Sequence, residues 1–183
     1  MPARCLSAAL CALLLAMAAG PAAAQRATPQ TTRDLLIKPS TRSVRDSIDA
    51  LALAVEAAGA KVVARVDHQA AALAAGLDMP ASEVLIFGNP KLGTPLMQAN
   101  PHAGLDLPLK ILAYADKAGK VWIVTTRASA LKARHGITGR DEVIGAMTAA
   151  LDKLTAAAAG VPVAPTPAPA TPSRGQLATP PRQ

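Results

Sequence analysis

The stretch Val84–Lys110 constrains the fold more than any other part of the chain. It begins as an apolar run typical of a buried strand, breaks at Gly88–Pro90, restarts at Thr94 and Pro95, and becomes extended again over Leu105–Lys110. Thr94 can cap a helix, and proline suits a first helical position because its missing N–H is not needed there. We therefore expect a strand, a sharp turn, a short helix beginning at Thr94, and a second strand.

Hydrophobic periodicity predicts the remaining elements. Ser43 followed by an acid three residues later indicates a helix start, and Gly59 is typical of the position after a helix end. Alternating and continuous apolar runs predict strands, with 83–87 expected to be central and buried on both faces. The expected strands are 34–38, 61–67, 83–87, 107–115 and 120–125, and Pro39 ends the first of them. The other expected helices are 68–75, 129–134 and 141–158.

This order of elements predicts an α+β fold. We expect a two-layer sandwich, with a mixed, mostly antiparallel sheet of about five strands and helices on one face. The strands at 107–115 and 120–125 are expected to form a hairpin across residues 116–119. The first strand, the helix after it and the second strand are expected to form a right-handed crossover unit.

The two ends of the chain differ from its middle. Residues 1–24 have a charged start, an apolar run of about a dozen residues and an Ala-x-Ala exit, which predicts a signal peptide cleaved near Ala24. Residues 25–32 read as a flexible leader, 31–158 as a single domain, and 159–183 as a Pro/Ala-rich disordered tail. We therefore expect a periplasmic or secreted protein with no membrane span after cleavage.

Composition excludes several classes of function. Both cysteines, Cys5 and Cys11, lie in the expected signal peptide, so the mature chain has no thiol for catalysis, redox chemistry or zinc binding. The core holds 15 basic and 12 acidic residues, which is too balanced for a nucleic-acid surface. The three histidines do not stand at metal-ligand spacing from one another. We expect no nucleic-acid partner, no metal and no cofactor.

Polar residues around the expected turn form a candidate ligand site. Free N–H groups at a helix start favour anions, and a lysine nearby would add positive charge. The alternative is that Asn89 only satisfies the turn and Thr94 only caps the helix. The tentative ligand-binding residues are His68, Asn89, Gly93, Thr94, Gln98 and Lys110.

Three functions are compatible with these residues. The first is a non-catalytic binding or interaction module of the bacterial envelope, with a small ligand near Asn89 and Lys110. The second is an enzyme that uses His68 as a general acid or base in a cleft with Asn89 and Lys110. The third is a structural module that forms a homodimer. The direction in which His68 points would discriminate among them.

The chain resembles the domain of unknown function 302 family. The most specific segments are Phe87–Pro90 and Gly93–Met97, and Val66–His68, Asp106–Lys110 and Arg134–Gly136 also match family positions. The resemblance covers about residues 35–136. It implies a two-layer α+β domain with an antiparallel-rich sheet, often dimeric, and many members are exported. The family has no settled activity, so the resemblance supplies no catalytic residues.

The chain departs from the family pattern after its last expected strand. Family members usually have an aromatic residue followed by an Asp-Pro or Asn-Pro turn there, whereas this chain has Val124–Ala128 without either feature. A function that depends on that turn would not extend to this chain.

Overall fold

The computed structural model describes residues 33–161. The expected signal peptide and leader, and all but the first residues of the expected tail, lie outside the described residues. The elements in chain order are β1 (Leu35–Ser40), α2 (Val44–Ala57), β2 (Lys61–Asp67), α3 (His68–Ala74), β3 (Ser82–Gly88), α4 (Pro90–Ala99), the 3-10 helix η1 (Pro101–Leu105), β4 (Leu109–Ala115), β5 (Val121–Thr126), α5 (Ala128–Arg134) and α6 (Asp141–Ala159).

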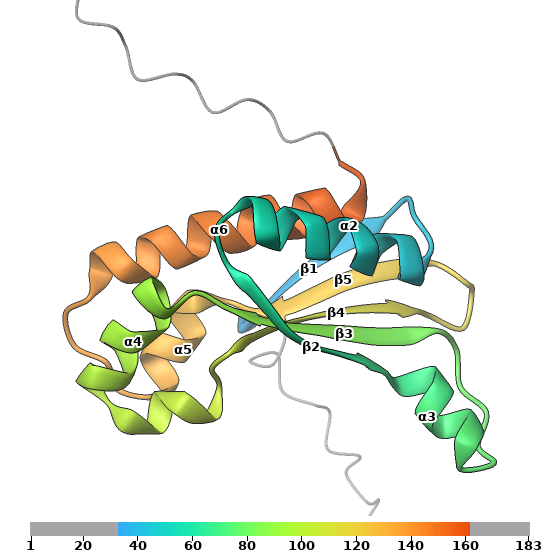
Figure 1. Cartoon of the computed structure of the whole chain (residues 1–183), viewed down its shortest axis with the longest axis horizontal. Coiled ribbons are helices and arrows are strands. Elements are labelled where there is room, and N and C mark those ends of the chain that lie inside the picture. The colour runs from blue at the N-terminus through green and yellow to red at the C-terminus, as the bar shows by residue number, and fades with distance from the viewer. Residues whose placement is uncertain (1–32, 162–183) are drawn as a thin grey trace, which may run out of the picture.

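All five strands form one sheet in the order β1-β5-β4-β3-β2 (Figure 1). Every neighbouring pair is antiparallel, and the β4–β5 hairpin forms as expected. The expected α+β class is confirmed, although the sheet is wholly antiparallel rather than mixed. β4 is the central strand, and β1 and β2 are the two edges.

Two long helices cover one face of the sheet. In Figure 1, α2 and α6 lie side by side above the strands, and both contact them. Side chains from α2, α6 and the covered face are almost fully buried, including Ile48, Leu51, Leu85, Ile111, Ile123, Met147 and Leu151. The remaining helices lie towards the ends, with α4 and α5 at one end and α3 at the other (Figure 1).

The predicted start and end of α2 are confirmed. The hydroxyl of Ser43 accepts a hydrogen bond from the Asp46 N–H, and α2 ends before Gly59. Gly59 has a φ of 71°, a left-handed conformation that glycine adopts without the steric cost of a side chain. The helices expected at 68–75, 129–134 and 141–158 also form, with small differences at their ends.

β1 and β2 run parallel, since four antiparallel pairings separate them, and they lie at opposite edges of the sheet. The segment through α2 therefore crosses from one edge strand to the other, with three strands between them. The strand over 82–88 lies beside the central strand and is fully covered on one face only, since Val84 and Ile86 stay partly exposed. β1 also continues through Pro39, which an edge strand tolerates because one side has no partner.

The short helix was expected to begin at Thr94, and this start is wrong. α4 begins at Pro90 with Asn89 as its cap, and Pro95 lies inside the helix. The Asn-Pro pair provides the same signal as Thr-Pro, five residues earlier: a side-chain acceptor followed by proline at the first helical position. Residues 33–161 contain no helix with the length and hydrophobicity needed to cross a membrane.

Candidate functional site

A large pocket lies at the end of the sheet where β2 begins and β3 ends. Its volume is about 490 Å³. One wall comes from α6 through Met147, Ala150, Leu151 and Leu154, and a second comes from α4. The rest of the lining comes from the residues after α2, the start of β2, the end of β3 and the segment that leads into β4, with Ala58, Ala60, Lys61, Val63, Phe87, Gly88, Leu107, Pro108 and Leu109.

Apolar atoms make up nearly all of the pocket wall. Among the described residues that line it, those with polar side-chain groups are Lys61, Asn89 and Thr94, and Lys61 is the one titratable residue. Lys61 and Thr94 are exposed, so their polar groups stand at the opening. Lys61 has no ion-pair partner among residues 33–161. The pocket thus offers an apolar interior with one free cation at its entrance.

Three of the six residues in the predicted site line this pocket. They are Asn89, Gly93 and Thr94, all at the start of α4. The Asn89 side-chain oxygen accepts a hydrogen bond from the Lys91 N–H at 2.9 Å, so that oxygen is already used as the helix cap. Gly93 leaves space beside Leu107, where an added Cβ would lie 3.7 Å from the nearest carbon.

The other three predicted residues lie elsewhere. His68 is exposed and begins α3, at the far end of β2 from the pocket. Asp67 lies six positions along the extended β2 from Lys61, which is roughly 20 Å. Gln98 is exposed on α4 and does not line the pocket. Lys110 lies beside a separate hollow of about 70 Å³. The structure therefore does not bring His68, Asn89 and Lys110 together.

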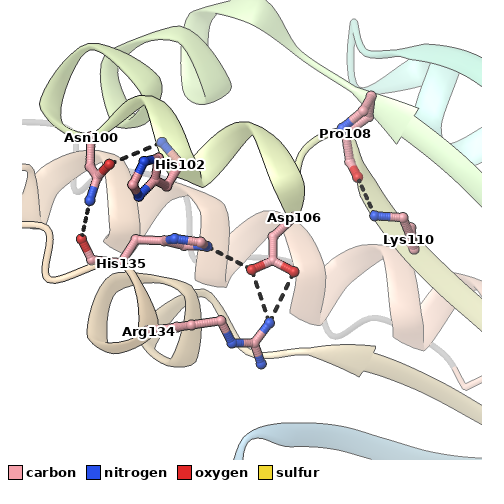
Figure 2. Close-up of polar contacts among 7 residues, drawn as sticks. All are labelled: Asn100, His102, Asp106, Pro108, Lys110, Arg134 and His135. Carbon is pink, nitrogen blue, oxygen red and sulfur yellow. Dashed lines mark hydrogen bonds and ion pairs between the residues drawn. The ribbon is translucent and has the colours of Figure 1, made fainter.

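A polar cluster holds the α4–η1 segment to α5 (Figure 2). Arg134 donates from Nη1 to both carboxylate oxygens of Asp106, at 2.9 Å each, and His135 Nε2 lies 2.7 Å from Asp106 Oδ2. Asn100 donates to the His135 carbonyl at 2.8 Å, and its side-chain oxygen accepts from the His102 N–H. Leu107 of the pocket wall follows Asp106 directly, so the cluster fixes that part of the wall.

The charge state of Asp106 reflects its partners. Partial burial alone would raise the pKa of Asp106, but the hydrogen bonds and charges of His135 and Arg134 outweigh it and hold the pKa below its usual value. The side chain of His135 is only 8% exposed. The polar groups of this cluster therefore pair with one another, and their bonds connect α5 to the α4–η1 segment. Within 33–161, no three His, Cys, Asp or Glu side chains gather as a metal ion would require.

Sequence reasoning missed most of the pocket wall. Ala150, Leu151 and Leu154 lie on α6, and their periodic spacing indicates only that they face the core. The contact of the His135 ring with Asp106 was not predicted either, because the two residues lie far apart in the sequence.

The curated relatives of this chain include proteins named as fluoride channels. "Fluoride-specific ion channel FluC 1" of Brucella suis biovar 1 is 42% identical over 122 residues, which cover 66% of this chain and 48% of that protein. The protein of the same name from Brucella abortus biovar 1 is also 42% identical, over 45% of its length. The chain thus spans about half the length of these relatives.

A solved structure and a family model agree on the domain. The crystal structure of an uncharacterized conserved protein from Bacillus stearothermophilus matches with a TM-score of 0.62 and 17% identity. The match covers 68% of this chain and 98% of that protein, and it shows a shared fold. The family model described as "Domain of unknown function DUF302" matches residues 36–154. The chain belongs to the DUF302 family.

Proposed function

We propose that this protein is an exported, non-catalytic module that binds a small amphiphilic ligand in the pocket between α4 and α6. The observation that carries the proposal is the volume of about 490 Å³ with an apolar wall. Known small-molecule sites are concave, mostly apolar and of ~300–1,000 Å³, with a few polar groups that orient the ligand. The expected signal peptide at 1–24 supports a location in the periplasm or outside the cell.

The chemistry of the wall suggests the class of ligand. Burial of an aliphatic or aromatic body against Met147, Leu151 and Leu154 would supply most of the affinity. A carboxylate or another anionic group could reach the unpaired Lys61 at the opening. We therefore propose an amphiphilic ligand with an apolar body and one acidic group.

The composition of the wall favours binding over catalysis. A general acid or base must lie within hydrogen-bond reach of the reacting group. Among residues 33–161, no histidine, carboxylate or tyrosine lines the pocket, and His68 lies at the other end of β2. An enzyme that uses His68 with Asn89 and Lys110 would need an arrangement that this structure does not have.

A matched pair of variants on α6 tests the proposal. Ala150 lines the pocket, whereas Ala149, its neighbour, is exposed and does not. The probe is an anilinonaphthalene sulfonate dye, displaced by decanoate. The Ala150→Trp variant should lose at least tenfold in dye affinity, while Ala149→Trp should bind like the wild type. Equal affinity of all three proteins would contradict the pocket as the site.

The acidic group of the ligand has a separate test. The Lys61→Ala variant should weaken decanoate more than decanol, because only decanoate carries a charge to pair with Lys61. If both probes weaken equally, Lys61 contributes through its apolar stem alone, and the acidic part of the proposal is wrong.

A second candidate function rests on the named relatives. Proteins named fluoride-specific ion channels share 42% identity with this chain over about half their length. We propose as the alternative that the domain acts together with fluoride transport in an envelope. In that case, fluoride added to the purified protein should shift ¹⁹F or backbone amide resonances at millimolar concentration. Unchanged spectra, together with unaltered fluoride tolerance of a deletion strain, would reject it.

A further inference from the structure

One end of the sheet face that points away from α2 and α6 carries a row of side chains with rings. Pro39 of β1, Trp122 of β5 and Tyr114 of β4 are cross-strand partners in turn. Side chains alternate between the two faces of a strand, so Trp122 and Tyr114 lie opposite the buried Ile123 and Ala113. Pro39 is exposed, and Trp122 and Tyr114 are partly exposed. Water therefore reaches this row in the described domain.

An aliphatic row extends the same apolar face. It runs from one edge of the sheet to the other, with each residue paired to the next: Ile37, Val124, Leu112, Val84 and Val66. Ile37 and Val66, at the two edges, are 39% and 37% exposed. The five strands make this apolar surface ~24 Å wide at the usual strand spacing of ~4.8 Å.

The C-terminal segment leaves the domain beside this face. The Thr41 N–H donates a hydrogen bond to the Ala159 carbonyl at 3.1 Å, which fixes the end of α6 at the end of β1 (Figure 1). Thr41 directly follows β1, and Pro39 lies two residues earlier in that strand. Because β1 is an edge strand, no other strand separates Val161 from the row that begins at Pro39.

Residues 162–173 have the sequence of a proline-rich recognition segment. They contain two Pro-x-x-Pro repeats, at 162–165 and 169–172, with Pro167 between them. A polyproline II helix has three residues per turn and needs no internal hydrogen bonds, so each repeat presents its two prolines on one side. Protein surfaces that bind such helices are lined with aromatic side chains. We propose that residues 162–173 lie across the row formed by Pro39, Trp122 and Tyr114 of the same chain as a polyproline II segment and cover it.

The chemistry of the segment fits an apolar surface. Residues 161–173 contain no charged side chain, so docking removes no charge from water. Each proline lacks an N–H, which leaves fewer backbone donors to be buried without a partner. The Tyr114 hydroxyl is able to donate a hydrogen bond to one of the segment's carbonyl groups.

The length of the segment and its attachment to the domain also fit. The twelve residues from 162 to 173 span about 37 Å at ~3.1 Å per residue, which exceeds the ~24 Å width of the sheet. A short covalent tether gives the segment an effective concentration in the millimolar range at this surface. A contact of modest intrinsic affinity is therefore enough to keep the row covered, and a separate protein would have to compete with the tethered segment.

The first experiment compares the emission of Trp122, the one tryptophan of the chain, in the protein from residue 25 to residue 183. The four-proline variant carries Pro165→Ser, Pro167→Ser, Pro169→Ser and Pro172→Ser. It should emit at longer wavelength than the wild type, because the indole loses its cover. The matched control carries Pro180→Ser and Pro181→Ser, which lie beyond the proposed contact, and should emit like the wild type. Both variants leave residues 33–161 unchanged, and circular dichroism checks that the fold is the same.

A nitroxide label tests directly whether the segment lies near Trp122. Both cysteines lie within residues 1–24, so Ala170→Cys supplies the one labelling site. In a polyproline II helix, the side that carries Ala170 holds neither pair of repeat prolines, so the label leaves the contact free. The label should quench Trp122 emission about twofold or more in the otherwise wild-type chain, and much less in the four-proline variant, whose tether has the same length. A label at Ala149→Cys, on the exposed face of α6, should not quench.

A change on the sheet tests the same contact from the other side. Ile37→Lys alters an exposed position beside Pro39 and should reduce the quenching by the Ala170→Cys label. Equal emission and equal quenching in the wild type and the four-proline variant would overturn the proposal, as would quenching that Ile37→Lys leaves unchanged. Quenching that falls when labelled chains are mixed with an excess of unlabelled wild type would place the segment on a neighbouring copy, and would also overturn it.

Discussion

The two sides of the segment from Pro90 to Asp106 differ, because one borders an open pocket and the other is occupied by paired polar groups. On the side that faces α6, apolar side chains surround a volume of about 490 Å³. On the side that faces α5, Asn100 and Asp106 bond to His135 and Arg134. Buried polar groups are costly unless they are paired, and on the polar side each of these groups has a hydrogen-bond partner. The difference suggests that one side positions the segment and the other receives a ligand.

The largest expected effect is on the apolar side. Leu151 is 1% exposed and lies in the pocket wall. Leu151→Ala should lower the free energy of unfolding by about 2–5 kcal/mol, because it removes buried contacts and enlarges a cavity. Urea unfolding measures this change. Leu53→Ala is the control, since Leu53 is 70% exposed and should change stability by less than about 0.5 kcal/mol.

Removal of the Asp106 charge tests the polar side. Asp106→Asn should lower the free energy of unfolding by about 1–3 kcal/mol at pH 7, because Arg134 and the buried His135 lose an ionised partner. The pKa of Asp106 is depressed in the folded protein, so its contribution is present above the ordinary value of 3.8. The contribution is lost as the pH falls through the folded pKa.

The pH dependence of this variant separates charge from packing. Urea unfolding of the wild type and Asp106→Asn at pH 7 and near pH 3 should give a difference that shrinks at the lower pH. A difference of the same size at both values would mean that the ionised carboxylate is not what holds α5 to the α4–η1 segment.

Asn89→Ala changes the cap of α4, which also lines the pocket. It should lower the free energy of unfolding by about 1 kcal/mol, because α4 loses its cap, and it should leave dye affinity nearly unchanged. Asn89→Asp should restore stability, since aspartate also caps helices. Loss of dye binding at full stability would instead make Asn89 a direct ligand contact.

His68→Ala should have the smallest effect. His68 is exposed and remote from the pocket, so we expect a change below about 0.5 kcal/mol and unaltered dye affinity. The same titration and urea experiments measure both. A large loss of dye binding would contradict the separation of His68 from the site.

Local signals predicted the elements better than their arrangement. Ser43 and Gly59 defined α2 because capping and a left-handed turn depend on a few adjacent residues. The placement of β1 and β2 at opposite edges depends on pairing between distant strands, which no local pattern encodes. α4 began earlier than expected because Asn89 and Pro90 offered the same cap as Thr94 and Pro95.

The candidate site was predictable only on its α4 side. The unusual residues Asn89, Gly93 and Thr94 marked a turn, and the structure puts that turn at the pocket. The opposite wall comes from Met147 and other residues of α6, whose pattern is that of any core-facing helix. Volume left empty between distant elements has no signature in the residues of one of them.

Native mass spectrometry of the full-length protein, purified from the envelope of a cell that exports it, tests the central claim most directly. We predict excess mass on the wild type that disappears on denaturation, belongs to a small amphiphilic molecule, and is absent from Ala150→Trp but present on Ala149→Trp. A wild type whose mass equals that of the polypeptide alone, or excess mass that Ala150→Trp retains, would contradict the assignment of the pocket as the ligand site.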